Sequence, residues 1–326
     1  MRIGIVGAGA IGGWMGVRLA KAGHEVSVLA RGATLATLRE QPWRLQLGAQ
    51  TLEARVHASD DAHQLGQQDV VIVAVKGPAL GTIAPAITPM IGAHTSVIPA
   101  MNGVPWWFLL GGGGELPATQ LRSVDPEGTI AQAIPLAHVI GCVVHASAFV
   151  SAPGVVTLKS GNELILGEPS GERSARLQSI CTELERAGFK VTASERVQRD
   201  IWYKLWGNMT MNPISALTGA TCDRMLDDPL VAEFTLRVMA EAAQVGGRIG
   251  CPIEESGHDR MAVTRKLGAF KTSMLQDAEA GRPLELDQLL GAPREIAKLL
   301  NTPTPNIDAL LGLSRLFAQS HGLYPR

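Results

Sequence analysis

Three polar side chains recur at helical spacing in an otherwise apolar segment. Lys204, Asn208 and Asn212 are each four residues apart and stand among tryptophan and methionine residues, so they line one face of a helix that Pro213 should end or kink. A lysine ammonium beside two carboxamides can hold a small anion and give a proton to an oxygen that gains charge. The alternative is a solvated polar stripe beside a buried one.

A glycine-rich turn at the start of the chain predicts a diphosphate site. In GAGAIG, Gly7 permits the tight turn, Gly9 lets the backbone approach a pyrophosphate, and Gly12 lets helix and strand pack closely. The diphosphate would then lie at a helix N-terminus, where free N–H groups favour negative charge. The turn lies within a complete strand–helix–strand unit, which favours a dinucleotide site over a glycine-rich turn without a ligand. The predicted contacts are Gly7, Ala8, Gly9, Ala10, Ile11 and Gly12.

The end of the second strand indicates which dinucleotide would bind. Sites for NAD usually have an acidic residue there, which holds the ribose hydroxyls. This chain has Ala30 followed by Arg31, with no carboxylate. A guanidinium pairs with a 2′-phosphate in two-pronged fashion, so the sequence favours NADPH or NADP⁺ over NAD. The alternative for Arg31 is an ordinary surface arginine.

The elements that must position these residues follow two different patterns. The first part of the chain alternates β-branched runs with helical patterns, which predicts a parallel sheet with right-handed crossovers. A Pro-Gly turn at Ser151–Gly154 predicts a hairpin, and the helix 174–187 leads into a last strand. Beyond about residue 195 only helical periodicity remains. We therefore predict a Rossmann-type domain over residues 1–195 and a helical domain over 196–326. The predicted strands are Arg2–Val6, Glu25–Leu29, Asp69–Val75, Ser96–Ala100, Val139–Val144 and Lys190–Ala193, and the predicted late helices are Arg199–Asn212, Leu230–Ile249, Ser256–Gly268, Gln288–Leu300 and Ile307–Gln319.

Composition narrows the class of function. The 326 residues carry a net charge of −1, with 46% hydrophobic and 18% charged residues, so no basic field exists for a nucleic acid or an anionic membrane. The four cysteines lack metal-ligand spacing and are expected to be reduced and buried, and no metal site is predicted. No apolar run approaches the length of a transmembrane helix. We expect a cytoplasmic protein that binds small molecules.

Several motifs together resemble one family. Lys-x-x-x-Asn-x-x-x-Asn-Pro occurs at 204–213, GAGAIG opens the chain, and Lys76 and Asn102-Gly103 follow strands; the late segments are Ser273-Met-Leu-Gln-Asp277, Glu285-Leu-Asp287 and Gly291. With these motifs in this order, the chain resembles the ketopantoate reductase (2-dehydropantoate 2-reductase) family from Met1 to about Pro305. The resemblance implies a Rossmann-type NADP-binding domain followed by an all-α C-terminal domain like that of 6-phosphogluconate dehydrogenase. It also implies NADPH-dependent reduction of ketopantoate to (R)-pantoate in pantothenate biosynthesis, in an interdomain cleft.

The resemblance implies a role for each matching residue. Lys204 would be the general acid for the ketone oxygen. Asn208, Asn212 and Ser273 would hold the carboxylate and hydroxyl of the 2-oxo acid substrate, and Asn102 would lie between nicotinamide and substrate. Lys76 and Glu285 would contact the cofactor, or Glu285 would orient the lysine. Considered singly, Lys76 could be a strand-end charge, Asn102-Gly103 an ordinary turn and Glu285 a surface residue.

Some positions depart from the family pattern and keep alternatives open. Lys76 is followed by Gly77-Pro78 and Asn102 is preceded by Met101, while the Val104-Pro105-Trp106-Trp107 loop leads into an insertion-like stretch, 111–128. The tryptophans could be core packing or could reshape the substrate pocket. A paralogous reductase of another 2-oxo acid or imine, and a non-catalytic NADPH-binding regulator, are the alternative functions. The helix 230–249 could bury its apolar face within the domain or in a homodimer.

Overall fold

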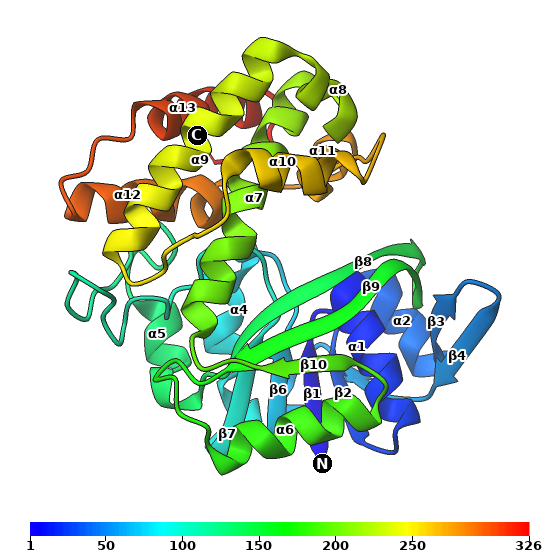
Figure 1. Ribbon diagram of the computed structural model, residues 1–326. Coiled ribbons are helices and arrows are strands. Elements are labelled where there is room, and N and C mark those ends of the chain that lie inside the picture. Colours follow the sequence, from blue (N-terminus) through cyan, green and yellow to red (C-terminus); the bar gives the residue numbers. More distant parts are fainter. Residues whose placement is uncertain (326) are drawn as a thin grey trace. The chain divides into compact units, whose positions relative to one another are not determined.

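The computed structural model describes residues 1–325 and divides the chain into two compact units (Figure 1). The first unit comprises Met1–Met101 and Thr129–Asp200, and the second unit comprises Asn102–Gly128 and the chain from Ile201 onward. The expected fold class, an α/β Rossmann-type domain and a helical domain, is confirmed. The division differs from the predicted one in the segment 102–128, which packs with the helices of the second unit although it lies between strands of the first.

The first unit is built on a five-stranded parallel sheet. Its strand order is β5-β2-β1-β6-β7, so β1 lies between β2 and β6. The four strands predicted here are confirmed, with β7 starting five residues earlier than expected, and only the short β5 was not predicted. The strands are β1 (Arg2–Val6), β2 (Glu25–Leu29), β5 (His57–Ser59), β6 (Gln68–Val73) and β7 (Ile91–Pro99).

A second, mixed sheet completes this unit. The predicted hairpin is confirmed: two long strands pair antiparallel around Pro153-Gly154, where Gly154 has φ of 72°. The other edge of β9 is shared, because its first half pairs with β3 and its second half with β10. The hairpin of β3 and β4 was not predicted. The strands are β3 (Trp43–Leu47), β4 (Gln50–Ala54), β8 (Gly141–Ala152), β9 (Val155–Gly167) and β10 (Lys190–Ala193).

Helix α1 (Ala10–Lys21) packs against both sheets, and its small residues make this possible. A Cβ added at Gly16 would lie 2.5 Å from the Trp43 ring, and one at Gly13 would lie 2.4 Å from Val156. On the same helix, Trp14 is fully buried and stacks edge-on against Phe189 at 4.9 Å. A helix enclosed on both sides needs glycine where backbone must approach side chains closely.

The remaining helices of the first unit lie between strands. Helix α6 begins as predicted, because the Ser174 hydroxyl caps it by accepting a hydrogen bond from the Leu177 N–H at 3.1 Å. The helices are α2 (Gly32–Glu40), α3 (Ala62–Leu65), α4 (Gly77–Ala86), α5 (Thr129–Ala133) and α6 (Ala175–Arg186), with the 3-10 turns η1 (Thr88–Met90) and η2 (Leu136–His138).

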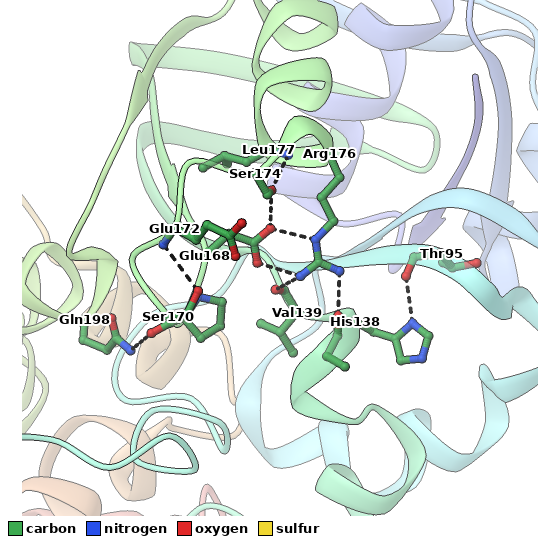
Figure 2. A network of polar contacts seen from close by, with 12 residues as sticks. Thr95, His138, Val139, Glu168, Ser170, Glu172, Ser174, Arg176, Leu177 and Gln198 are labelled. Carbon is green, nitrogen blue, oxygen red and sulfur yellow. Dashed lines mark hydrogen bonds and ion pairs between the residues drawn. The ribbon is translucent and has the colours of Figure 1, made fainter.

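An ion pair with a buried carboxylate fastens α6 to the end of β9 (Figure 2). Glu168 is 5% exposed, and Arg176 donates to both of its carboxylate oxygens, at 2.7 Å from Nε and 2.6 Å from Nη2. The same guanidinium donates to the backbone oxygens of Ala137 and Val139, at 2.6 and 3.3 Å. Four hydrogen bonds from one side chain therefore join α6, the end of β9 and the segment entering β8.

The second unit is helical. The predicted late helices are all present, but Pro213 does not end the first of them: α7 continues to Thr218, and the proline removes only one internal N–H donor. The expected helix 288–300 begins as a π-helical turn, η3. The elements are α7 (Val197–Thr218), α8 (Cys222–Asp227), α9 (Pro229–Arg248), α10 (Gly257–Arg265), α11 (Ser273–Glu279), η3 (Asp287–Gly291), α12 (Ala292–Leu299) and α13 (Pro305–Ser320).

The apolar face of α9 is covered within the second unit. Val238, Met239, Ala242 and Val245 are at most 1% exposed, and α9 packs against α8, α10, α12 and α13. Of the two alternatives for this helix, burial within the domain is therefore the correct one. Within residues 1–325, no helix combines the length and apolar character that crossing a bilayer requires.

The four cysteines are free and buried, as expected. Burial raises the pKa of the Cys181 and Cys222 thiols to about 11 in each case. A thiol with so high a pKa stays protonated at neutral pH and is a poor nucleophile and metal ligand. These cysteines therefore serve as small apolar core residues.

Replacing Arg176 with alanine is expected to destabilise the protein by about 2 kcal/mol or more at pH 7, because a buried carboxylate would lose its cation. Burial by itself raises the pKa of Glu168, but hydrogen bonds from Arg176 and Ser174 prevail and hold this pKa below its ordinary value. The ion pair thus stabilises the folded protein above the unfolded-state pKa of Glu168, which is about 4.3. This stabilisation is lost as the pH falls through the lowered pKa of the folded state. Urea denaturation at pH 7 and below pH 4 measures both effects.

The matched control is Arg173→Ala, since Arg173 pairs with Glu195 at the surface, where both side chains are more than half exposed. Such a pair contributes little. Equal destabilisation by the two substitutions would contradict the conclusion that Arg176 compensates the charge of the buried Glu168 carboxylate. So would a loss of stability in Arg176→Ala that is as large in acid as at pH 7.

Candidate functional site

The candidate cofactor residues of the first unit lie at one edge of the parallel sheet. The glycine turn follows β1, Arg31 follows β2 by two residues, and Lys76 follows β6 by three. Because β1 is hydrogen-bonded to both β2 and β6 in parallel, the carboxyl ends of all three strands are neighbours. The sheet is extended from β1 to β2 on one side and continues with β6 on the other side of β1. Ligands of doubly wound sheets bind at the carboxyl ends of the strands where the strand order reverses in this way.

The three turn glycines have different surroundings. Gly7 has φ of 98°, a conformation that favours glycine, and a Cβ added at Gly12 would lie 2.0 Å from the Gly7 carbonyl oxygen. A Cβ added at Gly9 would meet nothing within 4 Å. Gly9 is also the N-cap of α1 and supplies no side-chain acceptor. Gly12 is therefore needed for packing, while Gly9 leaves open space at a helix N-terminus suited to an anion.

Arg31 and Lys76 each stand at the N-cap of a helix, α2 and α4 respectively. Arg31 is exposed and Lys76 is half-buried. The departure after Lys76 has a local explanation, because Pro78 occupies the first turn of α4, where a missing N–H costs nothing. The Gly77-Pro78 pair therefore starts a helix without displacing the lysine from the sheet edge.

In the second unit, the lysine–asparagine stripe forms as predicted on α7. The Lys204 ammonium donates a hydrogen bond to Asn102 Oδ1 at 2.9 Å, which joins two of the predicted site residues from distant parts of the chain. Asn208 is half-buried and Asn212 is 7% exposed. The stripe is therefore buried at Asn212, while Lys204 and Asn208 are each only partly exposed.

Two tryptophans hold α7 in place behind this stripe. Trp202 donates its indole N–H to the Ala242 carbonyl oxygen at 3.1 Å, and Trp206 donates to that of Met239 at 2.8 Å. Both acceptors belong to α9. Buried indoles with satisfied N–H groups fix the rotation of α7 about its axis, and this rotation decides which way Lys204 points.

The loop that carries Asn102 is braced by the π-helical turn η3. Gly103 has φ of 78°, and a Cβ there would lie 2.7 Å from the Gln288 carbonyl oxygen, which also accepts a hydrogen bond from the Val104 N–H at 2.9 Å. Sequence reasoning missed Gln288, whose only signal was its place three residues after Glu285. Glu285 is half-buried, lies two residues before η3 and belongs to the second unit, as Lys204 does.

The chain's last residues also hold η3. Tyr324 donates a hydrogen bond to Asp287 Oδ1 at 2.6 Å, and the Leu284 N–H donates to the Leu323 carbonyl oxygen at 3.0 Å. Burial raises the pKa of Asp287, and burial together with Asp287 raises that of Tyr324. Ser273, the remaining predicted substrate contact, is exposed and opens α11 next to its cap, Thr272.

The tryptophan pair after Asn102 belongs to the core. Trp106, Trp107 and Phe108 are each 1% exposed, and the Phe108 ring lies 6.0 Å from that of Trp202. The stretch that follows is fixed by Glu295, which accepts hydrogen bonds from the N–H groups of Arg122 and Ser123 at 2.9 and 2.8 Å. Core packing, the first alternative, is therefore the correct interpretation of the pair.

Comparison with protein families covers both units. The family profile described as Ketopantoate reductase PanE/ApbA matches residues 3–171, and the profile of its C-terminal part matches residues 196–318. The chain belongs to the ketopantoate reductase family. A curated relative from Mesorhizobium japonicum, named 2-dehydropantoate 2-reductase, is 42% identical over 99% of this chain and 100% of its own length.

Solved structures agree with this membership. A provisionally named ketopantoate reductase from Ralstonia solanacearum MolK2 is 58% identical, with a TM-score of 0.95 over 99% of both chains. The 2-dehydropantoate 2-reductase from Methylococcus capsulatus is 25% identical, with a TM-score of 0.84 over 98% of both chains. A D-mandelate dehydrogenase solved with NADH and anilino(oxo)acetate has a TM-score of 0.84 at 20% identity, over 99% of this chain and all of that one, and shares the fold.

Alanine substitutions at Gly12 and Gly9 should distinguish a glycine that is needed for packing from one that leaves open space for a ligand. Gly12→Ala is expected to destabilise the protein by about 2 kcal/mol or more, because the new methyl group would overlap a backbone oxygen. Gly9→Ala, the matched control, should change stability by less than about 1 kcal/mol, because its methyl group enters open space. Chemical denaturation measures both. Equal losses at the two positions would show that the turn is packed differently.

Proposed function

We propose that this chain reduces ketopantoate to (R)-pantoate with NADPH, and that Lys204 is the general acid. The observation that carries the proposal is the hydrogen bond of 2.9 Å between Lys204 Nζ and Asn102 Oδ1, which brings together two of the family's motif segments. The names of relatives that span almost the whole chain support the substrate. NADPH, when bound, supplies the hydride.

The residues of the second unit would donate the proton and bind the substrate. Hydride addition to a ketone leaves negative charge on its oxygen, and the Lys204 ammonium stabilises this charge and then donates the proton. The Asn102 carboxamide holds the ammonium in place beforehand, so that little reorganisation is needed during the reaction. Asn208 and Asn212 present donors and acceptors from the same helix face to the rest of the substrate, with Ser273 as a further contact.

The residues at the sheet edge of the first unit would hold the cofactor. The open N-terminus of α1 at Gly9 suits the pyrophosphate, and Arg31 suits the 2′-phosphate of NADPH. Lys76 would add a further cation at the same edge. Glu285 would contact the cofactor or orient Lys204 from the second unit.

The alternatives differ in what supports them. A paralogous reductase of another 2-oxo acid or imine would use the same residues; burial of Trp106 and Trp107 removes one reason to favour it, because these rings pack in the core. A non-catalytic regulator would not need a lysine whose ammonium is held in place by Asn102, so this contact argues against it. We also infer a role in pantothenate biosynthesis and a cytoplasmic location. A homodimer stays a prediction.

Replacing Lys204 with alanine is expected to lower kcat by about 100- to 10,000-fold, since proton donation contributes rates of this size. The NADPH dissociation constant should change little. Lys204→Arg keeps the charge but not an acid that can release its proton near neutral pH, so it should also remain slow. Steady-state kinetics with ketopantoate and NADPH fluorescence titration measure the two effects.

The matched control is Lys298→Ala, at an exposed lysine of α12. This variant should behave as wild type. Turnover by Lys204→Ala near the wild-type rate would refute the general-acid role, and wild-type protein that turns over other 2-oxo acids far better than ketopantoate would favour the paralogue.

Replacing Arg31 with alanine is expected to raise the KM for NADPH by about 10- to 100-fold while that for NADH changes little, because only NADPH has the phosphate that the guanidinium would bind. Arg39→Ala is the control, because Arg39 lies on the same helix and pairs with Asp60. An equal rise for both cofactors would count against a 2′-phosphate contact.

A further inference from the structure

We propose that Tyr324 is a positioning residue for the reaction, and that it acts on Asn102 by holding the π-helical turn η3. The inference rests on the proposed function, because Asn102 and its partner Lys204 belong to the proposed site. Tyr324 acts through other residues of the second unit. It sets the place of the Asn102 carboxamide before a substrate arrives.

The segment after α13 holds the start of η3 at two points. The Tyr324 hydroxyl donates a hydrogen bond to Asp287 Oδ1 at 2.6 Å, and the Leu284 N–H donates to the Leu323 carbonyl oxygen at 3.0 Å. Leu323 is 4% exposed, and its own N–H donates to the Ala318 carbonyl oxygen of α13 at 2.7 Å. This segment is thus anchored by burial and by α13, so it can restrain the turn.

Turn η3 passes this restraint to the loop of Asn102. Gln288 directly follows Asp287, and its carbonyl oxygen accepts a hydrogen bond from the Val104 N–H at 2.9 Å. A Cβ added at Gly103 would lie 2.7 Å from both the carbonyl oxygen and the Cβ of Gln288, so the loop and the turn are in close contact. Asn102 directly precedes Gly103. A shift of Gln288 would therefore move the backbone that carries the Asn102 carboxamide.

Asn102 in turn holds the proposed acid. Its Oδ1 accepts the hydrogen bond of the Lys204 ammonium at 2.9 Å. Three hydrogen bonds, joined by one or two steps along the chain, therefore lead from Tyr324 to Lys204. All of the residues that make these bonds belong to the second unit.

The winding of η3 explains why a contact from outside the turn matters. π-Helices are rare, and η3 continues directly into the α-helix α12, so α-helical winding is its nearest alternative. Burial raises the pKa of Asp287 above its ordinary value, although the hydrogen bond from Tyr324 and the charge of Arg315 oppose this shift. Loss of the hydroxyl would take a strong donor from a half-buried carboxyl group and leave the turn free to rewind.

Tyr324→Phe tests the proposal, because it removes the hydroxyl and leaves the ring. The kcat for ketopantoate should fall by about 5- to 100-fold, since displacement of a reacting group by about 1 Å can cost about 100-fold. Asp287→Asn keeps an oxygen that accepts the hydroxyl, so its kcat should lie nearer to that of the wild type than the kcat of Asp287→Ala does. Steady-state kinetics with ketopantoate and NADPH measure all three variants.

A double variant tests whether the effect passes through Asn102. If it does, adding Tyr324→Phe to Asn102→Ala should lower kcat by less than about twofold, because the contact on which Tyr324 acts is already lost. Losses that multiply would mean that Tyr324 acts elsewhere and would overturn the proposal. A wild-type kcat in Tyr324→Phe would overturn it as well.

The matched control is Gln319→Ala. Gln319 donates a hydrogen bond to the Pro325 carbonyl oxygen at 2.9 Å, and this bond joins the same segment to α13 rather than to η3. The variant should keep the wild-type kcat. A loss equal to that of Tyr324→Phe would show that general packing of the segment, and not the contact with Asp287, is what matters.

An NMR measurement separates this inference from the proposed function. In protein whose lysines are isotopically labelled at Cε, the Lys204 resonance is assigned with Lys204→Ala. It should shift in Tyr324→Phe in the same direction as in Asn102→Ala, because both changes weaken the hydrogen bond to the ammonium, and it should stay in place in Gln319→Ala. If this shift occurs but the wild-type protein does not reduce ketopantoate, the proposed reaction fails and the positioning role stands. An unchanged resonance in Tyr324→Phe overturns the positioning role, whatever the protein reduces.

Discussion

Helix α1 is enclosed between two sheets, and much of the first unit depends on how closely it can approach them. Its backbone lies against the Trp43 ring at Gly16 and against Val156 at Gly13, distances that no side chain would allow. The parallel sheet on its other side needs Gly12 for the same reason. The N-terminus of this helix is consequently held still at the carboxyl edge of β1. A rigid helix end with free N–H groups is what a diphosphate site requires.

In the second unit, the main constraint is on the orientation of the charged Lys204 side chain on α7. Trp202 and Trp206 fix the rotation of α7 through their hydrogen bonds to α9. The ammonium of Lys204 is then held by a carboxamide from a loop that is itself braced by the π-helical turn η3. The two indole N–H groups are buried and have hydrogen-bond partners, so they add rigidity with little desolvation cost. π-helical turns occur frequently at functional sites, and here one supports the loop of Asn102 through the Gln288 carbonyl oxygen.

The departures from the family pattern have local explanations. Gly77-Pro78 begins α4 without moving Lys76 from the sheet edge, and Trp106 and Trp107 fill the core of the second unit. The stretch 111–128 is tied down by Glu295 and by a salt bridge of 2.6 Å between Arg248 and Glu115. None of these changes removes a residue from the lysine–asparagine stripe.

Sequence alone determined the parts that depend on local rules. The glycine turn, the strands of the parallel sheet, the hairpin at Gly154 and the spacing of Lys204, Asn208 and Asn212 each follow from residues within a few positions of one another. Of the two outcomes expected at Pro213, an end of the helix is wrong, because α7 continues to Thr218.

Only the tertiary structure decided the long-range contacts. The pairing of β3 with β9, the return of 102–128 to the second unit and the meeting of Lys204 with Asn102 join segments that are distant in sequence. Gln288 carried no motif, and its importance comes from the loop beside it, which has no side chain at Gly103. Close approach between distant segments depends on the shape of both surfaces, and local periodicity contains no information about that shape.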